Sequence, residues 1–249
     1  MRALVISDIH GNLQALEAVL AAAGAVDQVW NLGDTVGYGA NPNEVLDIIR
    51  PLAAVNVRGN HDRVCCGLTS SQGFNPVAAE AANWTHATLT PENLQWLRDM
   101  PKGPVPASRR AMCAHGSPLH EDHYIVSMRD AWTPLQRMDT EITFFGHTHV
   151  QGGFSQRDAE WEEERPQYEE QDVAEEVTID VPEGTRHLIN PGSVGQPRDS
   201  DWRAAFAIYD DVLEQVSFYR IPYDVAAAQA AIRTAKLPER LAGRLAVGR

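Results

Sequence analysis

The chain has 249 residues, of which 43% are hydrophobic and 22% charged, and its formal net charge is −13. This composition is typical of a globular protein with a sizeable core and excludes a disordered or fibrous chain. The negative charge also excludes a protein that binds nucleic acid or anionic membranes through nonspecific positive charge.

Apolar strands and amphipathic helices alternate over the first 60 residues. Strands are expected at residues 4–6, 26–32 and 53–57, and helices at 13–23 and 41–50. Leu13, Leu16 and Leu20 recur on one face of the first helix, and Asn41 with Pro42 begins the second. This alternation favours right-handed βαβ crossovers and a mainly parallel first sheet.

The rest of the chain is richer in strands. Strands are expected at residues 111–114, 142–145, 150–154, 177–181, 187–189, 204–209 and 214–220, with helices at 75–88, 91–100, 129–138 and after Asp224. We expect this half to be largely antiparallel. The fold class is therefore α/β, with two packed mixed β-sheets flanked by helices. No boundary is apparent, so residues 1–249 are expected to form a single domain.

Most of the excess negative charge lies in one segment, at about residues 155–180. Eleven acidic residues occur there, against only Arg157 and Arg165. We interpret the segment as a solvated loop or hairpin inserted into the domain. An arm that attracts a partner or a cation is the alternative.

The cysteines and the N-terminal residues indicate a cytoplasmic protein. Cys65, Cys66 and Cys113 are odd in number and lack the spacing of a zinc site, so reduced thiols are expected. The short apolar run after Arg2 ends at Ser7, which is unlike a signal peptide. No stretch approaches the roughly 18 to 20 apolar residues that cross a bilayer, so no membrane partner is expected.

Five polar clusters follow apolar runs, at points where strands are expected to end. They are Asp8 with His10, Asp34 after Gly33, the run Asn60, His61 and Asp62 after Gly59, His115 before Gly116, and His147 with His149 after Gly146. A single cluster of this kind is explained by a turn or a helix cap. Five of them at strand ends, where α/β sheets bind ligands, predict one shared site.

Carboxylate and imidazole groups are the ligands that a pair of catalytic divalent cations needs. Two cations about 3.5 to 4 Å apart hold the attacking and leaving oxygens of an in-line phosphoryl displacement. Mixed nitrogen and oxygen ligands suit Mn²⁺, Fe or Zn²⁺ better than Mg²⁺, which prefers an all-oxygen shell. The expected cofactors are two divalent metal ions, Mn²⁺ in the first place and Fe or Zn²⁺ as alternatives.

The order of these motifs resembles the calcineurin-like metallophosphoesterase superfamily. The motifs are SDIHGN at residues 7–12, GD at 33–34, GNHD at 59–62, HG at 115–116 and GHTH at 146–149. Residues 33–43 (GDTVGYGANPN) and 190–199 (NPGSVGQPRD) are similar to stretches of its small stand-alone bacterial and archaeal members. The resemblance spans about residues 4–219 and implies a four-layer αββα fold.

The resemblance also implies roles for individual residues. Asp8, His10 and His149 would bind one metal ion, Asn60, His115 and His147 the other, and Asp34 both. A hydroxide held between the ions would attack phosphorus, so no Ser or Cys nucleophile is required. His61 would face the leaving group with Asp62 orienting its ring, and Arg198 would hold a phosphate oxygen.

Several other residues are weaker candidates. His120, His123 and Tyr124 either line a substrate pocket or belong to a solvated loop, and Arg63 is a further candidate for substrate contact. His86 and His187 lie in an expected helix and strand, and we interpret both as structural.

The expected function is metal-dependent hydrolysis of phosphodiesters, and also monoesters, of small or nucleotide-like substrates. The protein phosphatases of the superfamily have GDxxDRG and GNHE motifs, whereas Thr35 follows Asp34 here and Asp62 ends GNHD, so protein phosphatase activity is not expected. The alternative function is a non-catalytic, protein-binding scaffold on the same fold. Such a scaffold would be expected to lose ligands or His61, and this chain keeps them. The sequence does not predict the oligomeric state.

Overall fold

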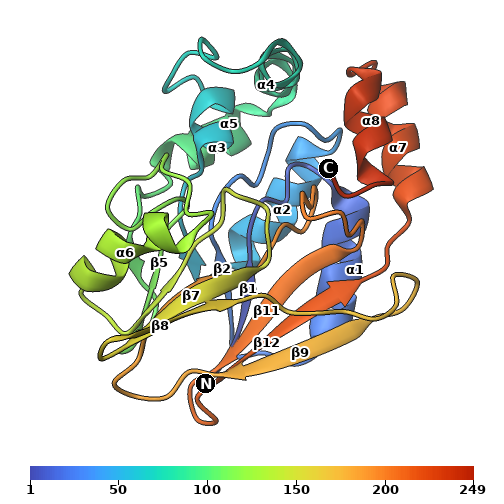
Figure 1. Ribbon diagram of the computed structural model, residues 1–249. Coiled ribbons are helices and arrows are strands. Elements are labelled where there is room, and N and C mark those ends of the chain that lie inside the picture. The colour runs from blue at the N-terminus through green and yellow to red at the C-terminus, as the bar shows by residue number, and fades with distance from the viewer.

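Two six-stranded sheets pack together at the centre of the protein, with helices around them (Figure 1). The computed structural model describes residues 1–249. The strand order is β3-β2-β1-β11-β12-β9 in the first sheet and β4-β5-β6-β10-β7-β8 in the second. The prediction of an α/β fold with two mixed sheets is confirmed.

The observed elements agree closely with the expected ones. The first sheet contains β1 (Arg2–Ile6), β2 (Gln28–Asn31), β3 (Val55–Asn56), β9 (Glu175–Asp180), β11 (Ala204–Asp210) and β12 (Gln215–Ile221). The second contains β4 (Val105–Pro106), β5 (Ala111–Cys113), β6 (Ile142–Phe144), β7 (Gly152–Arg157), β8 (Glu160–Glu164) and β10 (Arg186–Asn190). The helices are α1 (Leu13–Ala23), α2 (Pro42–Leu52), α3 (Asn60–Cys65), α4 (Pro76–Thr88), α5 (Pro91–Asp99), α6 (Met128–Arg137), α7 (Val225–Thr234) and α8 (Glu239–Leu245). Only α3, β4 and β8 were not expected. No helix has both the length and the apolar character needed to cross a membrane.

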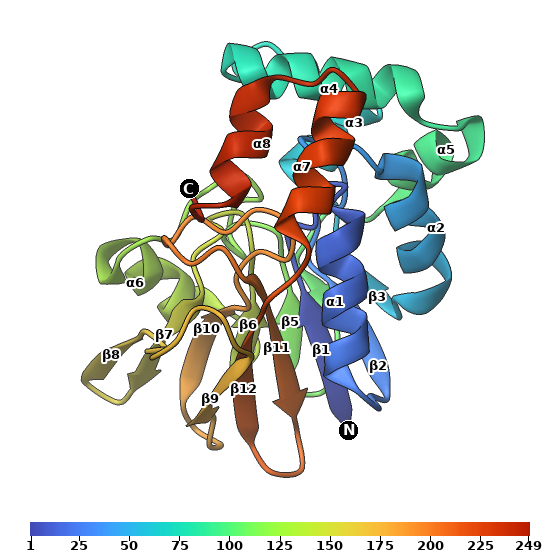
Figure 2. The same ribbon diagram turned by 90° about the vertical axis from the view of Figure 1, so that its right-hand side faces the viewer.

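Three apolar layers hold the sheets and helices together. In β1, Leu4 belongs to the core shared with α1, whereas Val5 belongs to the core between the two sheets. Because alternate side chains of a strand point to opposite faces, a central strand buried on both faces is apolar throughout. On the far side of the second sheet, Phe154 of β7 packs in one cluster with Leu135 of α6. The layers therefore run helix, sheet, sheet, helix (Figure 2).

Both sheets mix parallel and antiparallel pairs, which corrects the expected division of the chain. β1 pairs in parallel with β2 and antiparallel with β11, and β11 continues antiparallel to β12. In the second sheet β5, β6 and β10 are parallel neighbours. The prediction of a mainly parallel first sheet is therefore wrong, because β11, β12 and β9 extend that sheet in antiparallel pairs. The later half of the chain is largely antiparallel, as expected. Apolar periodicity records which faces of a strand are buried and not which strand lies beside it, so it does not reveal that β11 returns to β1.

The acidic segment joins the two sheets at their open edge. β8 pairs with β7 at the edge of the second sheet, and β9 pairs with β12 at the edge of the first. Every second residue of β9 is exposed. Charged side chains on an edge strand oppose its pairing with another chain. The acidity of this segment therefore protects two sheet edges.

The three cysteines are free and buried. Cys65 and Cys66 pack in a core cluster, and the His86 ring is within hydrogen-bond distance of the Cys65 carbonyl oxygen at 2.8 Å. Cys113 lies between the sheets, where burial raises the pKa of its thiol. Because the thiolate is the reactive form, these cysteines contribute packing and not nucleophiles.

His187 in β10 provides a test of the packing between the sheets. Its side chain is 3% exposed, neither ring nitrogen has a hydrogen-bond partner, and burial lowers its pKa to about 4. The unfolded chain takes up this proton near its ordinary pKa of about 6.5, so between these values protonation favours unfolding. The free energy of unfolding should therefore decrease as the pH falls, by up to about 1.4 kcal/mol per pH unit from this residue.

We expect His187→Leu to remove that contribution. Urea unfolding of both proteins at pH 7 and pH 5 measures it, because leucine has a similar volume and does not titrate. If the variant and the parent lost the same stability between the two pH values, the proposed environment of His187 would be wrong.

Candidate metal centre

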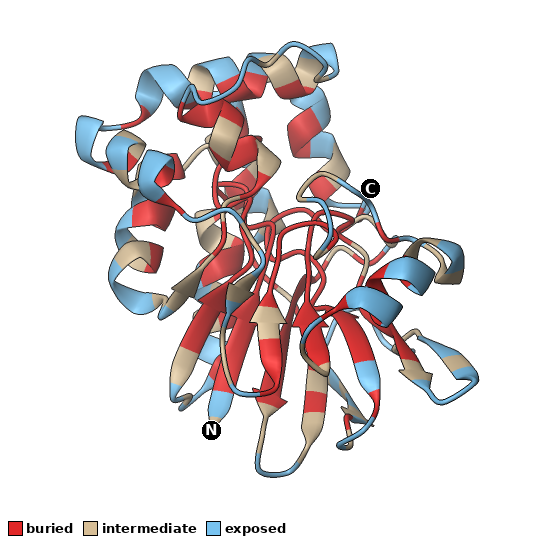
Figure 3. Cartoon of the chain, turned by 90° about the vertical axis from the view of Figure 1, so that its left-hand side faces the viewer, coloured by how far each residue is buried: buried red, intermediate tan, exposed pale blue.

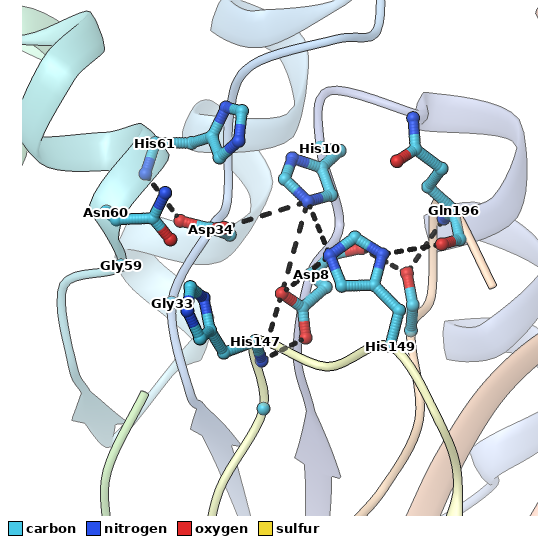
Figure 4. Close-up of polar contacts among 12 residues, drawn as sticks. Asp8, His10, Gly33, Asp34, Gly59, Asn60, His61, His147, His149 and Gln196 are labelled. Atoms are coloured by element: carbon cyan, nitrogen blue, oxygen red, sulfur yellow. Dashed lines mark hydrogen bonds and ion pairs between the residues drawn. The ribbon is translucent and has the colours of Figure 1, made fainter. Parts of the chain in front are cut away.

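The polar clusters predicted from the sequence meet where β1, β2, β3, β5 and β6 end. Figure 4 shows four of them, those of Asp8, Asp34, Asn60 and His147. Their loops run side by side, since the Asp8 N–H donates to the Gly33 carbonyl at 2.9 Å and the Gly146 N–H to the His115 carbonyl at 2.7 Å. Figure 3 shows a bundle of buried loops between the strand ends and the helices. The backbone therefore directs these side chains into one interior volume.

Several residues of the clusters adopt a strained backbone conformation. Asp8, His10, Asp34, His147 and His149 have φ between 50° and 69°. The left-handed region is uncommon for residues with a Cβ, although Asp and His enter it more readily than most, and it costs about 1 kcal/mol per residue. Such outliers persist where the surrounding structure enforces them and gather at functional sites. Five neighbouring cases mark these loops as the functional site.

One group of ligand atoms consists of Asp8, His10, Asp34 and His149. All four are buried, and their ligand atoms lie within 4.8 Å of one another. Asp8 Oδ1 is 3.2 Å from His149 Nε2 and 4.0 Å from His10 Nε2, and the two ring nitrogens are 3.1 Å apart. Figure 4 shows the rings and carboxylates facing one another. Imidazole and carboxylate groups that converge in this way are suited to a transition-metal cation.

A second group consists of Asp34, His115 and His147. His115 Nε2 lies 3.4 Å from Asp34 Oδ2, 3.1 Å from His147 Nδ1 and 3.2 Å from Asn60 Oδ1. The same Asp34 Oδ2 is 3.7 Å from His10 Nε2 in the first group. Asp34 is therefore common to both groups and presents the same oxygen, Oδ2, to both.

The imidazole rings are oriented as metal ligands would be. Nδ1 of His10, His115 and His149 lies 2.6 to 3.2 Å from a backbone carbonyl oxygen in each case. A ring nitrogen that donates to a carbonyl fixes the tautomer and leaves the lone pair of Nε2 free to bind a metal. His147 Nε2 is buried and has no hydrogen-bond partner. The residues present therefore fit divalent cations.

The electrostatics of the site centre on two buried carboxylates. Burial opposes the ionisation of Asp8 and Asp34, but the facing imidazoles outweigh it and lower the pKa of both carboxyls. Burial also opposes charge on His115, but the Asp34 carboxylate outweighs it and raises the pKa of His115 to about 10. A proton on His115 thus balances Asp34, and a cation bound there would release it.

His61 and Asp62, the two predicted catalytic residues, lie in the first turn of α3. The His61 ring packs on Tyr38 with centroids 4.3 Å apart, its Nδ1 has no partner, and burial lowers its pKa to about 4. The Asp62 carboxylate accepts hydrogen bonds from the Gly59 N–H at 2.9 Å and the Val36 N–H at 3.2 Å. The expected orientation of the His61 ring by Asp62 is not found. Asp62 instead ties together the loops that follow β2 and β3.

A pocket of about 620 Å³ opens beside the two groups. Tyr124 lines it and stacks on the His147 ring with centroids 3.9 Å apart. Arg198, the predicted substrate-binding residue, lines it as well. The sequence reasoning missed Arg240 and Arg244 of α8, which also line this pocket. They belong to no motif, and their only signal is a four-residue spacing in a helix remote from every cluster.

The remaining candidates lie outside the pocket. Arg63 forms an ion pair with Asp122 at 2.9 Å, which engages its guanidinium. His120 and His123 stack on each other with centroids 4.3 Å apart, and they line a neighbouring pocket of about 580 Å³. Only Tyr124 of that trio reaches the larger pocket.

Two mixed sheets whose strand ends converge on buried Asp and His groups define an α/β protein with a candidate metal-binding site. Residues 1–211 match the model of the calcineurin-like phosphoesterase superfamily domain, and the chain belongs to this family. It is similar to a solved metallophosphoesterase from Sphaerobacter thermophilus, with 43% identity, a TM-score of 0.86 and all of both chains covered. An uncharacterised protein of Methanocaldococcus jannaschii is 35% identical over 98% of this chain and 97% of its own length.

More distant relatives match only part of the chain. The symmetrical bis(5'-nucleosyl)-tetraphosphatase of Erwinia tasmaniensis is 30% identical over 46% of this chain and 44% of its own length. The chain therefore spans less than half of that enzyme. A hypothetical protein from Pyrococcus horikoshii, 20% identical with a TM-score of 0.76 over the whole chain, shares the fold.

Gly59 allows a test of how closely the loop after β3 must approach the loop after β2 that carries Asp34. A Cβ added there would lie 2.0 Å from Asp34 Oδ1 and 2.4 Å from the Asp34 nitrogen. We expect Gly59→Ala to displace Asp34, to lower stability by about 1 to 3 kcal/mol and to reduce bound metal. Gly243→Ala is the control, because its Cβ would meet nothing within 4 Å. Thermal melting and elemental analysis measure both effects, and a Gly59→Ala protein that matched the parent in both would contradict this geometry.

Proposed function

We propose that the chain is a dinuclear metal-dependent phosphoesterase that hydrolyses phosphodiesters, and also monoesters, of small or nucleotide-like substrates. The observation that carries the proposal is that two groups of buried ligand atoms share Asp34 beside a pocket of about 620 Å³. The ligands that we assign are Asp8, His10 and His149 to one ion, Asn60, His115 and His147 to the other, and Asp34 to both. The mixed nitrogen and oxygen donors support Mn²⁺, with Fe and Zn²⁺ as alternatives.

Two divalent cations would supply Lewis-acid polarisation of the phosphoryl group and would acidify water for attack at neutral pH. The chain supplies the remaining functions through its own side chains. Arg198 lines the pocket, and its guanidinium is suited to bind a phosphate oxygen. His61 lines the pocket and can exchange a proton with the departing oxygen. Asp62 keeps the α3 loop, and with it His61, in place.

The pocket size supports a small substrate. A volume of about 620 Å³ lies within the range of roughly 300 to 1,000 Å³ that is usual for sites of small molecules and cofactors. The partial similarity to nucleosyl-tetraphosphatases supports nucleotides among the small phosphoesters. The net charge of −13 disfavours a nucleic-acid polymer or an anionic membrane as partner.

We also propose that residues 1–249 act as one domain, with the acidic segment at about 155–180 as an insertion. The three free, buried cysteines support a cytoplasmic location. A protein-binding scaffold on the same fold is the competing function, and it requires neither metal nor hydrolysis. Activity measurements on variants of the site separate the two.

Asp34→Asn tests the shared ligand. The amide retains the size of the side chain but removes the charge that two cations would share, so we expect loss of measurable hydrolysis and a lower metal content. The assay compares chromogenic phosphodiester and monoester cleavage after metal-stripped protein is supplied with Mn²⁺, Mg²⁺, Zn²⁺ or Fe²⁺. Asp172→Asn, on the exposed acidic segment, serves as the control. Normal turnover and normal metal content in Asp34→Asn would rule out this assignment.

His61→Ala separates catalysis from metal binding. Since His61 is assigned to proton transfer and not to the metals, we expect full metal content with a rate about 100-fold to 10,000-fold lower. His120→Ala, an exposed residue of the neighbouring pocket, is the control. A His61→Ala protein with the parental rate would remove the residue from the mechanism.

A further inference from the structure

The wall of the pocket beyond the candidate ligands is strongly cationic. Arg198 from the loop after β10 and Arg240 with Arg244 from α8 all line it. The two residues of α8 are four positions apart, so their side chains lie on one face of the helix. Figure 2 shows α8 beside α4, at the end of the molecule where the strands that carry the metal ligands terminate.

None of these three arginines pairs with an Asp or Glu side chain, and Arg244 Nε donates a hydrogen bond to the backbone oxygen of Arg249. Arg198 Nε is buried without any hydrogen-bond partner, and neither α8 arginine takes part in an ion pair. Elsewhere in the protein buried arginines pair with acids, as Arg110 does at 2.7 Å and Arg203 at 2.6 Å. The chain has 34 acidic residues against 21 basic ones, so unpaired arginines are not a consequence of scarce acids. An anionic ligand in the pocket can therefore bind these guanidinium groups without displacing an acidic side chain.

The electrostatic state of α8 agrees with this. Arg244 lies over the Tyr38 ring with its guanidinium carbon 5.9 Å from the ring centroid. Burial, followed by the positive charge of Arg198, lowers the pKa of Arg244 to about 10. The guanidinium therefore remains charged at neutral pH. Three positive charges therefore line one pocket, in addition to any cations that the two carboxylates Asp8 and Asp34 would balance, and a substrate with several phosphates offers more negative charge to them than a single phosphodiester does.

We propose that Arg240 and Arg244 form a phosphate subsite and that the substrate is a polyphosphate ester of the nucleoside or dinucleoside polyphosphate class. This inference rests on the proposed function and specifies its substrate. One phosphate lies at the metal ligands, and the adjoining phosphates extend along the arginines. In the reaction the water oxygen bonds to phosphorus and a phosphoanhydride P–O bond breaks. The departing phosphate keeps the bonding electrons, and the protons of the water pass to that phosphate or to solvent.

Binding to metal-stripped protein tests the subsite without any turnover. Calorimetry in the presence of a chelator compares inorganic tripolyphosphate with orthophosphate, using the parent, Arg240→Gln and Arg240→Gln with Arg244→Gln. We expect tripolyphosphate to bind at least tenfold more tightly than orthophosphate, and each substitution to weaken it by about tenfold. Arg129→Gln, an equal charge change on the exposed face of α6, is the control. Arg240 is exposed, so its single variant remains informative if the double variant is unstable.

A kinetic comparison then tests the α8 phosphate subsite separately from the proposed phosphoesterase function. With Mn²⁺ supplied, the ratio of kcat/KM for a dinucleoside tetraphosphate to kcat/KM for a chromogenic diester should fall at least 30-fold in the double variant. Equal binding of the two phosphates by the parent, or an unchanged ratio in the double variant, would overturn the α8 subsite. Failure of the parent to cleave any ester would overturn the proposed function instead. The calorimetry would still show whether the α8 subsite binds tripolyphosphate.

Discussion

The carboxylates of Asp8 and Asp34 are almost completely buried. Histidine rings lie next to both, and neither carboxylate pairs with a lysine or an arginine. An isolated buried charge costs several kcal/mol, so these groups require cations in the same interior volume. The imidazoles around them supply lone pairs that are aimed inward because their other nitrogens bond to the backbone. The strained φ angles of five residues are a further cost that the site imposes on its loops.

The fold meets this requirement by bringing strand ends from two sheets to one place. Each loop is short and buried, and its amides bond to the neighbouring loop, as between Asp8 and Gly33. Charge is then distributed by location: acidic residues cover the edge strands β8 and β9, while arginines gather at the pocket. The negative chain therefore places three arginines at the pocket where an anionic substrate would enter.

Much of this organisation could be predicted from the sequence. Asp8, Asp34 and the HxH pair at His147 follow apolar strands, and a strand end is a position that local periodicity can locate. The order of strands could not be predicted, because the pattern of β11 fits either sheet equally well. The hydrogen bond that the Asp62 carboxylate accepts from the loop after β2 could not be predicted either, since it depends on which backbone amides of that loop approach it. Arg240 and Arg244 were missed because α8 reaches the site only through tertiary packing.

The most direct test of the account is anomalous X-ray scattering from crystals of the protein grown with Mn²⁺. A dinuclear centre should give two manganese peaks, one bounded by Asp8, His10 and His149, the other by Asn60, His115 and His147, with Asp34 between them. A single peak, or peaks away from Asp34, would contradict a shared dinuclear centre. It would also remove the basis for assigning hydrolysis to this pocket.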